Sequence, residues 1–526
     1  MSRGAPACYT YPMTKYDVQI TTPIYYPNGD PHIGHAFTTV VGDILKRCHE
    51  LAGRTVFYST GLDEHGQKMQ DTIAKTNKTI TQFLDEKAGV FKSLFEKLGI
   101  AYDTFIRTTE PRHVKFCQEI LSRVYEKGLV EKSEYEGLYC VGCEQFKTQS
   151  DLDANGCCPD HKTKPVMQKE ESYSFKMERF RPWLVKHIES HPEFIQPVEY
   201  RHAVLNMLAE PLPDLCISRP KSRVSHGIEL PFDRDFVVYV WFDALLNYAT
   251  VMGGELNPNC AHIMAKDIIK PHCIIWPIML HSLGMTLPKH CYVHGYWTAA
   301  DGSKMSKSLG NVVDPFQTID LFGAETLRYF FARNMSRADS PISNDMVLAV
   351  HNGELANVIG NGFYRVIKFL DKQCAGHFPD VKQFRPADDA FLHETVNRIA
   401  TFFAPTPKDP IIDFNFESVP AQTDLVAEIG RSINGFLDQN APWKLAETDK
   451  PAFNSIMLTA LEASRLMFEL AYPIIPLASQ SVFDALNTPF NPKHHTITAR
   501  KIKAGPIGPY RVLFTRLDPK TEKKHG

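Results

Sequence analysis

The sequence predicts an α/β protein in which a doubly wound parallel sheet is split by an insertion and followed by an all-helical domain. Three observations lead to this fold class. A strand, an amphipathic helix and a second strand follow one another within residues 17–58, and a βαβ unit of this kind belongs to a parallel sheet. A segment rich in Cys and Gly interrupts the pattern at residues 131–175. Beyond about residue 350 only helical periodicity remains.

Length and composition fit a multidomain globular protein. The 526 residues exceed the roughly 100 to 200 that one domain usually holds. Hydrophobic residues make up 43% and charged residues 22%, which excludes a disordered or fibrous chain. The formal net charge is -2, so contact with RNA would need local basic patches rather than bulk charge.

The sequence also limits where the protein works. No apolar run approaches the roughly 20 residues that a membrane span needs, and residues 1–15 lack the apolar core of a signal peptide. We therefore expect a cytoplasmic protein. The 12 Cys residues are too few for a disulfide scaffold, so buried and reduced thiols are expected for most of them.

The first unit begins with a short strand at Val18 and Ile20, which a turn of Pro, Asn and Gly ends at residues 27–31. Apolar residues from Phe37 to Leu51 then recur every three or four positions and predict a helix that Gly53 ends. A second strand follows at residues 55–58. In a parallel sheet the ligand site lies beyond the carboxyl ends of the strands. The residues expected there are Tyr26, His32, His35, Asp63 and His65.

The remaining elements follow in chain order. Helical periodicity spans residues 80–98 and 110–127, and the insertion comes next. Sheet-like and helical segments return at residues 236–248 and 262–283, followed by a strand at 290–294 and a polar loop at 298–311. The parallel sheet is therefore split in sequence. Four long helices predict a bundle, at residues 353–370, 389–403, 419–437 and 453–470.

The motif His32-Ile33-Gly34-His35 stands between the first strand and the first helix. Helix N-termini attract anions, Gly34 permits a ligand to approach the backbone, and two imidazoles can donate to phosphate oxygens. The motif therefore indicates a nucleotide-phosphate site. Two unrelated surface or core histidines are the alternative.

A basic motif, Lys304-Met305-Ser306-Lys307-Ser308, lies far along the chain between Gly302 and Gly310. Lys is a mobile point charge that suits a polyphosphate whose charge shifts as pyrophosphate leaves, and glycines give the loop room to close. A solvated basic loop is the alternative. The two motifs together favour ATP chemistry.

With these two motifs the chain resembles the class I aminoacyl-tRNA synthetases, and among them the methionine-specific family. The resemblance runs from about residue 17 to about residue 518. It includes Tyr25-Tyr26-Pro27-Asn28-Gly29, Gly61-Leu62-Asp63-Glu64-His65-Gly66, Trp241-Phe242-Asp243-Ala244 and Lys266-Asp267-Ile268. It implies a Rossmann-like catalytic domain with an inserted connective peptide and a helical anticodon-binding domain. The implied activity is ATP-dependent ligation of L-methionine to tRNA(Met) through methionyl-adenylate, with release of pyrophosphate and then AMP.

The resemblance assigns roles to the motif residues. His32 and His35 would hold the ATP phosphates, and Lys304 and Lys307 would stabilise the transition state, with Mg²⁺ held largely by ATP. The carboxylate of the amino acid attacks the α-phosphate, so positioning and charge neutralisation carry the reaction. The implied ATP-binding residues are His32, Gly34, His35, Lys266, Asp267, Lys304 and Lys307.

A pocket for methionine should be aromatic and aliphatic, with one weak polar contact to sulfur. By resemblance Asp63 takes the ammonium group, and the side chain is surrounded by Ile24, Tyr26, Trp241, Ala244, Leu245, Tyr248 and His272. On pattern alone, Trp241, Leu245 and Tyr248 would be core residues of a helix. Two neighbours depart from the family pattern, since Ala265 stands where Gly commonly precedes Lys266 and Pro271 where Phe commonly precedes His272.

Four soft ligands with the spacing of a zinc knuckle lie in the insertion: Cys140, Cys143, Cys158 and His161. The family commonly has four Cys here, so His161 and the adjacent Cys157 are departures. A structural Zn²⁺ and a metal-free knuckle are both open. Four protein ligands would leave no open position for catalysis.

Three residues of the helical domain match the anticodon readers of the family. Asn361 and Arg365 are four apart and share a helix face, and Trp443 follows a cap and a Pro at residues 440–442. Trp stacks on an unstacked base, while Asn and Arg read base edges. On pattern alone all three are ordinary surface residues. The expected partner is tRNA(Met) with its CAU anticodon.

The resemblance also predicts a domain plan and a monomer. The catalytic halves are residues 17–130 and 216–310, the connective peptide 131–215, a stem-contact-like linker 311–352, the anticodon-binding domain 353–500 and a C-terminal tail 501–526.

A synthetase for leucine, isoleucine or valine would need a larger editing insertion, and one for cysteine would need zinc in its pocket. A silent tRNA-binding paralogue is opposed by the intact His and Lys residues, and a plain nucleotidyltransferase by the helical bundle.

Overall fold

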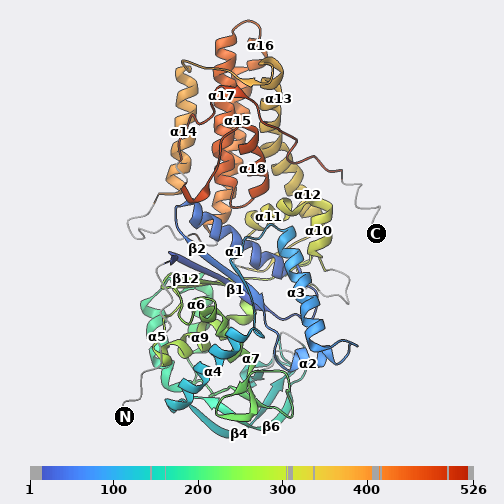
Figure 1. Cartoon of the computed structure of the whole chain (residues 1–526), viewed down its shortest axis with the longest axis vertical. Coiled ribbons are helices and arrows are strands. Elements are labelled where there is room, and N and C mark those ends of the chain that lie inside the picture. The colour runs from blue at the N-terminus through green and yellow to red at the C-terminus, as the bar shows by residue number, and fades with distance from the viewer. Residues whose placement is uncertain are drawn as a thin grey trace. The chain divides into compact units, whose positions relative to one another are not determined.

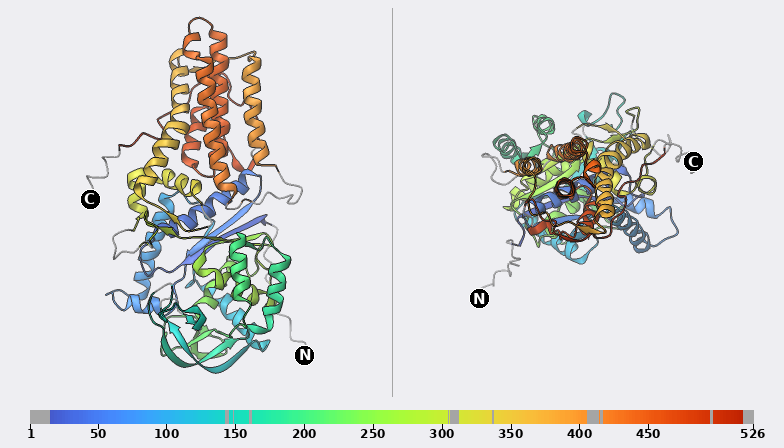
Figure 2. Two further views of the ribbon diagram at one scale, coloured as in Figure 1. Left: turned by 180° about the vertical axis from the view of Figure 1, so that it is seen from behind. Right: turned by 90° about the horizontal axis from the view of Figure 1, so that it is seen from above.

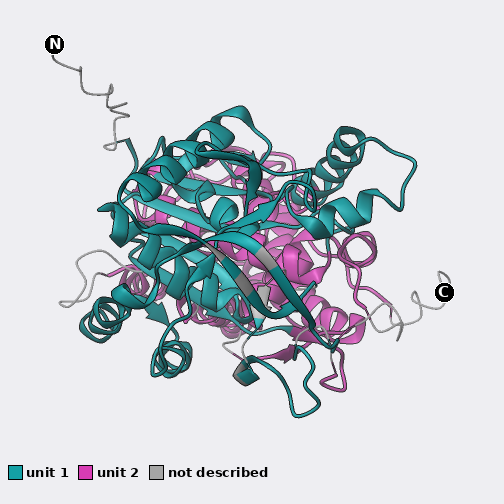
Figure 3. Ribbon diagram, turned by 90° about the horizontal axis from the view of Figure 1, so that it is seen from below, with its two compact units in different colours: residues 1–31, 56–96, 101–296 teal, residues 32–55, 97–100, 297–526 magenta. Residues whose placement is uncertain are grey.

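The structure is a computed structural model of the chain (Figure 1). It describes residues 15–141, 145–147, 149–159, 162–303, 305, 312–335, 338–404, 414, 417–494 and 497–518. The chain divides into two compact units, coloured teal and magenta in Figure 3. The sheet unit holds residues 1–31, 56–96 and 101–296, and the helical unit holds residues 32–55, 97–100 and 297–526.

A six-stranded parallel sheet organises the sheet unit, in the order β3-β2-β1-β12-β13-β7. The central strands β1, β2 and β13 are buried along nearly their whole length, which is typical of strands covered on both faces. β1 pairs with β2 on one side and with β12 on the other, so segments before and after the insertion build one sheet. The strands are β1 (Val18–Tyr25), β2 (Val56–Leu62), β3 (Thr104–Arg107), β7 (Ile195–Gln196), β12 (Cys260–Ala265) and β13 (His290–His294).

The helices of the sheet unit differ in burial, from α4 with one buried face to α8, which is buried on all sides. In α4 the buried residues include His113, Cys117, Ile120 and Val124, at spacings of three and four. The helices are α2 (Gln67–Ile73), α3 (Ile80–Lys97), α4 (Pro111–Glu126), α5 (Arg181–Ser190), α6 (Val198–Met207), α7 (Val240–Leu245), α8 (Asn247–Thr250) and α9 (Trp276–Leu283). Short turns of other helix types are η2 (Gln149–Asp151), η3 (Glu178–Phe180), η4 (Lys266–Ile268) and the π-helix η5 (Pro271–Ile275).

Residues 130–238, which include the predicted insertion and the start of the predicted second catalytic half, form two small antiparallel sheets. One has the order β5-β4-β6-β8, and its long pair β4 and β6 runs in register from Val130 opposite Phe175 to Tyr139 opposite Val166. The other has the order β10-β11-β9. The strands are β4 (Val130–Cys140), β5 (Gln145–Lys147), β6 (Val166–Phe175), β8 (Leu215–Cys216), β9 (Ser218–Pro220), β10 (Glu229–Leu230) and β11 (Asp233–Val238).

The helical unit is built around long helices that run side by side (Figure 2). Every residue of α17 from Ser455 to Ala471 is buried, so this helix is enclosed by its neighbours. Stacked rings of Phe391 and Phe436, with centroids 4.4 Å apart, join α14 to α15. The helices are α1 (Ile33–Leu51), α10 (Pro315–Phe322), α11 (Ala324–Arg333), α12 (Asn344–Val350), the π-helix η7 (His351–Gly360), α13 (Asn361–Gln373), α14 (Pro386–Phe402), α15 (Ser418–Asn440), α16 (Pro442–Leu445), α17 (Lys450–Ala471), α18 (Pro476–Ala485) and η8 (Pro492–His494).

After η8 the chain returns along the bundle as an extended strap. It contains β17 (Gly505–Pro506), which pairs with β16 (His377–Phe378). Farther along, Tyr510 donates its hydroxyl hydrogen to Asp371 at 2.7 Å, and His351 Nε2 donates to the carbonyl of Thr515 at 2.9 Å. A second short ladder joins β14 (Trp297–Thr298) and β15 (Ser340–Pro341). No helix in the described ranges combines the length and hydropathy that crossing a bilayer requires.

The predicted fold class is confirmed, as are the first βαβ unit, the helices near residues 80–98 and 110–127, and the strand at 290–294. The expectation of no strands beyond residue 350 is wrong in one small respect, the β16 and β17 pair. Strands of two residues have no alternation to detect. For the same reason β7, inside the predicted connective peptide, was not expected as an edge of the parallel sheet.

Candidate functional site

Two histidines cap the start of α1 in the helical unit. Gly34 N donates to His32 Nδ1 at 3.1 Å, and His32 N donates to His35 Nδ1 at 3.2 Å, so each ring satisfies a backbone N–H at the helix start. The rings stack with centroids 3.7 Å apart. This is a capping box made of imidazoles instead of the usual hydroxyl and carboxylate.

The cap fixes which ring nitrogen carries hydrogen. Because both Nδ1 atoms accept a hydrogen bond, the neutral rings of His32 and His35 carry hydrogen on Nε2. Burial, and then the neighbouring His32, hold the pKa of His35 well below its ordinary value. The helix start therefore offers N–H donors of the kind that phosphate oxygens accept.

Gly34 is favoured by packing at this point. A Cβ there would lie 3.0 Å from Cε1 and 3.1 Å from Nδ1 of His32. The predicted reason for Gly34 was access of a ligand to the backbone; the structure adds that a side chain would push the His32 ring away from its cap.

In the sheet unit, the carboxyl ends of β1 and β2 bring together residues predicted from the first motif region. Asp63 N donates to the carbonyl of Tyr25 at 2.9 Å, and Ile24 pairs with Gly61. Tyr26 packs on a small apolar cluster formed by Met69, Ile73, Phe83 and Leu84. Ile24, Tyr26 and Asp63 are thus neighbours at one sheet edge, where a parallel sheet binds its ligand.

Tyr248 and His272 form the polar element of the predicted methionine pocket. His272 lies in the π-helix η5, and its Nδ1 donates to the carbonyl of Ile268 at 2.8 Å. Burial lowers the pKa of His272 to about 4, so the ring is neutral and its Nε2 accepts. The Tyr248 hydroxyl, 2.7 Å away, therefore donates to His272 Nε2. The Tyr248 oxygen can still accept a hydrogen bond, but its hydrogen is already donated to His272.

Helix α7 supplies the other pocket residues. Ala244 and Leu245 are buried, and the ring of Trp241 lies edge-on to His272 with centroids 6.2 Å apart. Among the described residues, the buried Trp241 Nε1 has no hydrogen-bond partner. A buried donor without a partner is unusual and is the kind of group that a ligand can satisfy.

The two departures from the family pattern are accommodated locally. Ala265 ends β12 with φ −81° and ψ 158°, a conformation that does not need glycine. Pro271 is the first residue of η5, where a missing N–H costs nothing. Lys266 and Asp267 follow in η4, directly beyond the carboxyl end of β12, and Lys266 Nζ lies 4.7 Å from the ring centre of Tyr296.

Several predicted residues lie outside the described residues. These are Lys304 and Lys307 of the basic motif, and Cys143 and His161 of the knuckle. The described residues just before the motif form a tight turn, in which Gly302 adopts φ 81° and Ala299 N bonds to the carbonyl of Ser303 at 2.9 Å.

In the described part of the knuckle, the neighbouring residues Cys157 and Cys158 differ in burial. Cys140, at the end of β4, and Cys158 are at most 1% exposed. Cys157 is partly exposed, and its backbone N–H bonds to the Asp153 carboxylate at 3.0 Å. Buried soft donors at Cys140 and Cys158 fit a structural zinc, which would be completed by Cys143 and His161.

The three predicted anticodon readers lie at the surface of the helical unit. Asn361 begins α13, and both it and Arg365 are exposed. Trp443 of α16 is 47% exposed. Within the described part of the chain, neither the Asn361 amide nor the Arg365 guanidinium forms a hydrogen bond. Exposed aromatic and amide groups of this kind are suited to an unstacked base.

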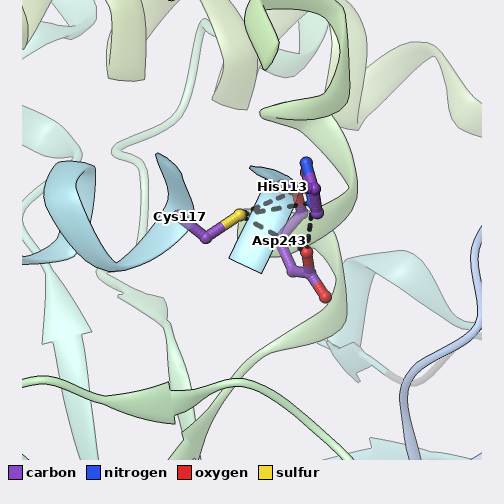
Figure 4. Close-up of side chains that lie close together, drawn as sticks. All are labelled: His113, Cys117 and Asp243. Carbon is purple, nitrogen blue, oxygen red and sulfur yellow. Dashed lines mark hydrogen bonds and ion pairs between the residues drawn. The ribbon is translucent and has the colours of Figure 1, made fainter. Parts of the chain in front are cut away.

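A buried polar cluster was not predicted. His113 and Cys117 of α4 and Asp243 of α7 bring their ligand atoms together (Figure 4). His113 Nε2 donates to Asp243 Oδ1 at 2.7 Å, and the Cys117 Sγ lies 3.2 Å from the same nitrogen. The Cys117 Sγ also lies 3.6 Å from Asp243 Oδ1, and burial and the nearby carboxylate raise the pKa of Cys117 well above its ordinary value. The cluster is therefore a hydrogen-bond network; the sequence signal was Asp243 within the quoted Trp241–Ala244 motif.

Comparisons with known proteins agree with this geometry. The family described as "tRNA synthetases class I (M)" matches residues 18–163 and 155–367, and the "Anticodon binding domain of methionyl tRNA ligase" matches residues 421–522. The split parallel sheet, the His-Ile-Gly-His helix start and the helical bundle thus define a class I aminoacyl-tRNA synthetase.

Individual relatives narrow the class. The methionine–tRNA ligase of Clostridium tetani is 36% identical over 96% of this chain and 79% of its own length, and that of Streptomyces coelicolor is 38% identical over 89% of each. A solved structure of Mycobacterium tuberculosis methionyl-tRNA synthetase in complex with methionyl-adenylate has a TM-score of 0.85 at 28% identity, covering 95% of this chain and 99% of that one. The chain belongs to the methionyl-tRNA synthetase family.

Proposed function

We propose that this protein ligates L-methionine to tRNA(Met) in two steps, first forming methionyl-adenylate and pyrophosphate from ATP and then esterifying the tRNA with release of AMP. Family membership over nearly the whole chain supports the reaction. The main structural observation in its favour is the cap formed by His32 and His35. It places two neutral imidazoles, each with a hydrogen on Nε2, at the start of a helix.

In the first step the methionine carboxylate attacks the α-phosphorus of ATP. His32 and His35 donate hydrogen bonds to phosphate oxygens, and Lys304 and Lys307 neutralise the charge that moves onto the leaving pyrophosphate. No protein base is needed, because the attacking carboxylate is already ionised. ATP brings its Mg²⁺, which remains largely bound to the phosphates. Lys266 and Asp267 contribute to the nucleotide site from the end of β12.

Methionine binds beyond the carboxyl ends of β1 and β2 in the parallel sheet. Asp63 accepts from its ammonium group, and its side chain lies among Ile24, Tyr26, Trp241, Ala244, Leu245, Tyr248 and His272. A flexible thioether suits aromatic and aliphatic walls. The polar groups proposed to face the thioether are the Tyr248 oxygen and the Trp241 Nε1–H.

The tRNA is recognised through its CAU anticodon, which Asn361, Arg365 and Trp443 read. Cys140, Cys143, Cys158 and His161 would hold one structural Zn²⁺ that stiffens the connective peptide. A monomer, a cytoplasmic location and the domain boundaries given above stay predictions.

The test is ATP–pyrophosphate exchange with each of the twenty amino acids in the absence of tRNA. Exchange with methionine alone is expected, and Lys304→Ala should lower it by orders of magnitude while methionine binding is nearly intact. Exchange with no amino acid would favour a silent tRNA-binding protein. Exchange with another amino acid alone would overturn the assigned substrate.

A further inference from the structure

Asp243 of α7 is a fully buried carboxylate that binds histidines from two other elements. Its Oδ1 accepts a hydrogen bond from His113 Nε2 of α4, and its Oδ2 accepts one from His65 Nδ1, which lies beyond the end of β2, each at 2.7 Å. Figure 4 shows the contact with His113. The side chains of His65 and His113 are 6% and 0% exposed, and that of Asp243 is 0% exposed.

The carboxylate is ionised and both of its oxygens are engaged. Burial by itself would raise its pKa, but the two imidazoles hold the pKa of Asp243 well below its ordinary value. The ionised acceptor requires hydrogen on His65 Nδ1 and on His113 Nε2. The other nitrogen of His113 lies 2.9 Å from Thr250 Oγ1 on α8, so the ring is held at both ends. Charge-assisted bonds of this length belong to the stronger class.

The elements joined in this way carry the two ends of the proposed methionine site. His65 is two residues beyond Asp63, the proposed partner of the ammonium group, and Asp63 is itself bonded to β1 through Tyr25. On the other side, α7 carries Trp241, Ala244 and Leu245 from the proposed side-chain pocket. A single buried carboxylate therefore connects the ammonium end to the side-chain end.

We propose that Asp243 is a positioning residue that sets the spacing between the ammonium site at Asp63 and the side-chain site on α7. The inference rests on the proposed function and deepens it. Because Asp243 is wholly buried, it acts through His65 and through its own helix and not by contact with substrate. Holding both ends of an amino acid at a fixed spacing makes the two contacts cooperative, since the second is made without further ordering.

Two unreactive probes measure this cooperativity. L-Methioninol and its desamino analogue differ only in the ammonium group, and neither has a carboxylate that ATP could activate. The ratio of their inhibition constants against methionine in pyrophosphate exchange gives the gain in affinity from the ammonium group. In Asp243→Asn the amide turns N–H toward one of the two histidines, so this gain should fall at least fivefold. The affinity for the desamino probe should change less than threefold, and the KM for ATP less than twofold.

Matched variants keep the test decisive. Asp235→Asn, which changes an exposed carboxylate on β11, should leave the ratio as in the wild type. If Asp243→Asn fails to fold, the gain should still fall in His65→Ala and recover in His65→Asn, because Asn keeps a donor close to the position of Nδ1.

Two outcomes would overturn the inference in different ways. Equal weakening of both probes, with an unchanged ratio, would give Asp243 a general structural role and reject positioning. No methionine-dependent exchange in the wild type would overturn the proposed function and the inference with it.

Discussion

Asp43 and Arg328 form a buried ion pair, with Asp43 Oδ2 lying 2.7 Å from Arg328 Nη2 and neither side chain more than 1% exposed. Asp43 lies within α1, whose start carries His32 and His35. Arg328 of α11 also donates to the carbonyls of Pro473 and Ile474 at 2.8 Å, between α17 and α18. The helix that begins with the proposed phosphate site is thereby fastened to the bundle.

Arg328→Met should destabilise the protein by about 3 kcal/mol, because the buried carboxylate of Asp43 keeps only Arg47 as its ion-pair partner and the carbonyls of Leu98, Pro473 and Ile474 lose their donor. Urea unfolding of the full chain measures the effect. Arg431→Met, at an exposed position of α15, is the matched control and should stay within about 0.5 kcal/mol of the wild type. Equal effects of the two substitutions would show that the pair contributes little.

Two buried histidines predict acid sensitivity. Burial lowers the pKa of His272 and of His294 from 6.5 to about 4. Between these values the unfolded chain binds protons that the folded chain does not. Stability is therefore complete above about pH 6.5 and is lost as the pH falls towards 4, by up to about 3 kcal/mol for each group.

The melting temperature between pH 7 and about pH 4.5 checks this expectation. His294→Asn should flatten the dependence, because Asn does not titrate yet can still donate to the carbonyl of Gly295. His202→Asn, at an exposed site, should leave it unchanged. A steeper dependence in His294→Asn would contradict the assignment of a neutral buried ring.

Gly34→Ala should impair adenylate formation without unfolding the protein. The new Cβ would meet His32 Cε1 at 3.0 Å and displace the ring from the cap. The kcat for pyrophosphate exchange should fall by about tenfold or more, since about 1.4 kcal/mol of lost transition-state stabilisation is enough. Gly89→Ala, where a Cβ meets nothing within 4 Å, is the control. Normal exchange in Gly34→Ala would argue against a role for the His32 ring.

Trp443→Ala should spare pyrophosphate exchange and weaken aminoacylation. Stacking on a base is worth about 1–3 kcal/mol, so kcat/KM for tRNA should fall by about 5- to 150-fold. Trp443→Phe keeps an aromatic face and should lose less. If Trp443→Ala instead lost pyrophosphate exchange but still transferred methionine from the adenylate to tRNA normally, the assignment of the helical unit to anticodon binding would be contradicted.

Elemental analysis of the purified protein should find about one zinc per chain, bound by four ligands. Cys158→Ser should remove it and Cys157→Ser should retain it, because only Cys158 of the two is fully buried. If Cys158→Ser retained zinc and Cys157→Ser lost it, Cys157 and not Cys158 would be the ligand. Zinc absent from the wild type would leave a metal-free knuckle.

Local patterns predicted most of the fold. The turn after Tyr25, the apolar stripe from Phe37 to Leu51 and Gly53, which adopts φ 80°, define α1 from within its own sequence. The π-helices η5 and η7 were not expected, because their apolar spacing over one or two turns hardly differs from that of an α-helix. The predicted helix at residues 353–370 is in fact η7 followed by α13.

The supporting network of the site lay beyond such patterns. His65 and His113 are 178 and 130 residues from Asp243, and no spacing rule relates residues that only the folded sheet unit brings together. The cap on α1 was also missed in part. The motif indicated two phosphate donors, but that the same rings close the helix through Nδ1 is a property of the folded backbone.

α1 has a further consequence for how the chain is made. Its residues are buried on nearly every side, yet apart from residues 97–100 its companions in the helical unit begin only at residue 297. On the ribosome, α1 is made long before Ile474, and at about 5 to 20 residues per second the interval is about 20 to 85 s. The nascent chain therefore carries α1 through synthesis of the sheet unit before its partners α11 and η8 exist. The helical unit is thus completed late, and in this interval apolar surface of α1 lacks these partners, a condition that favours aggregation of a nascent chain.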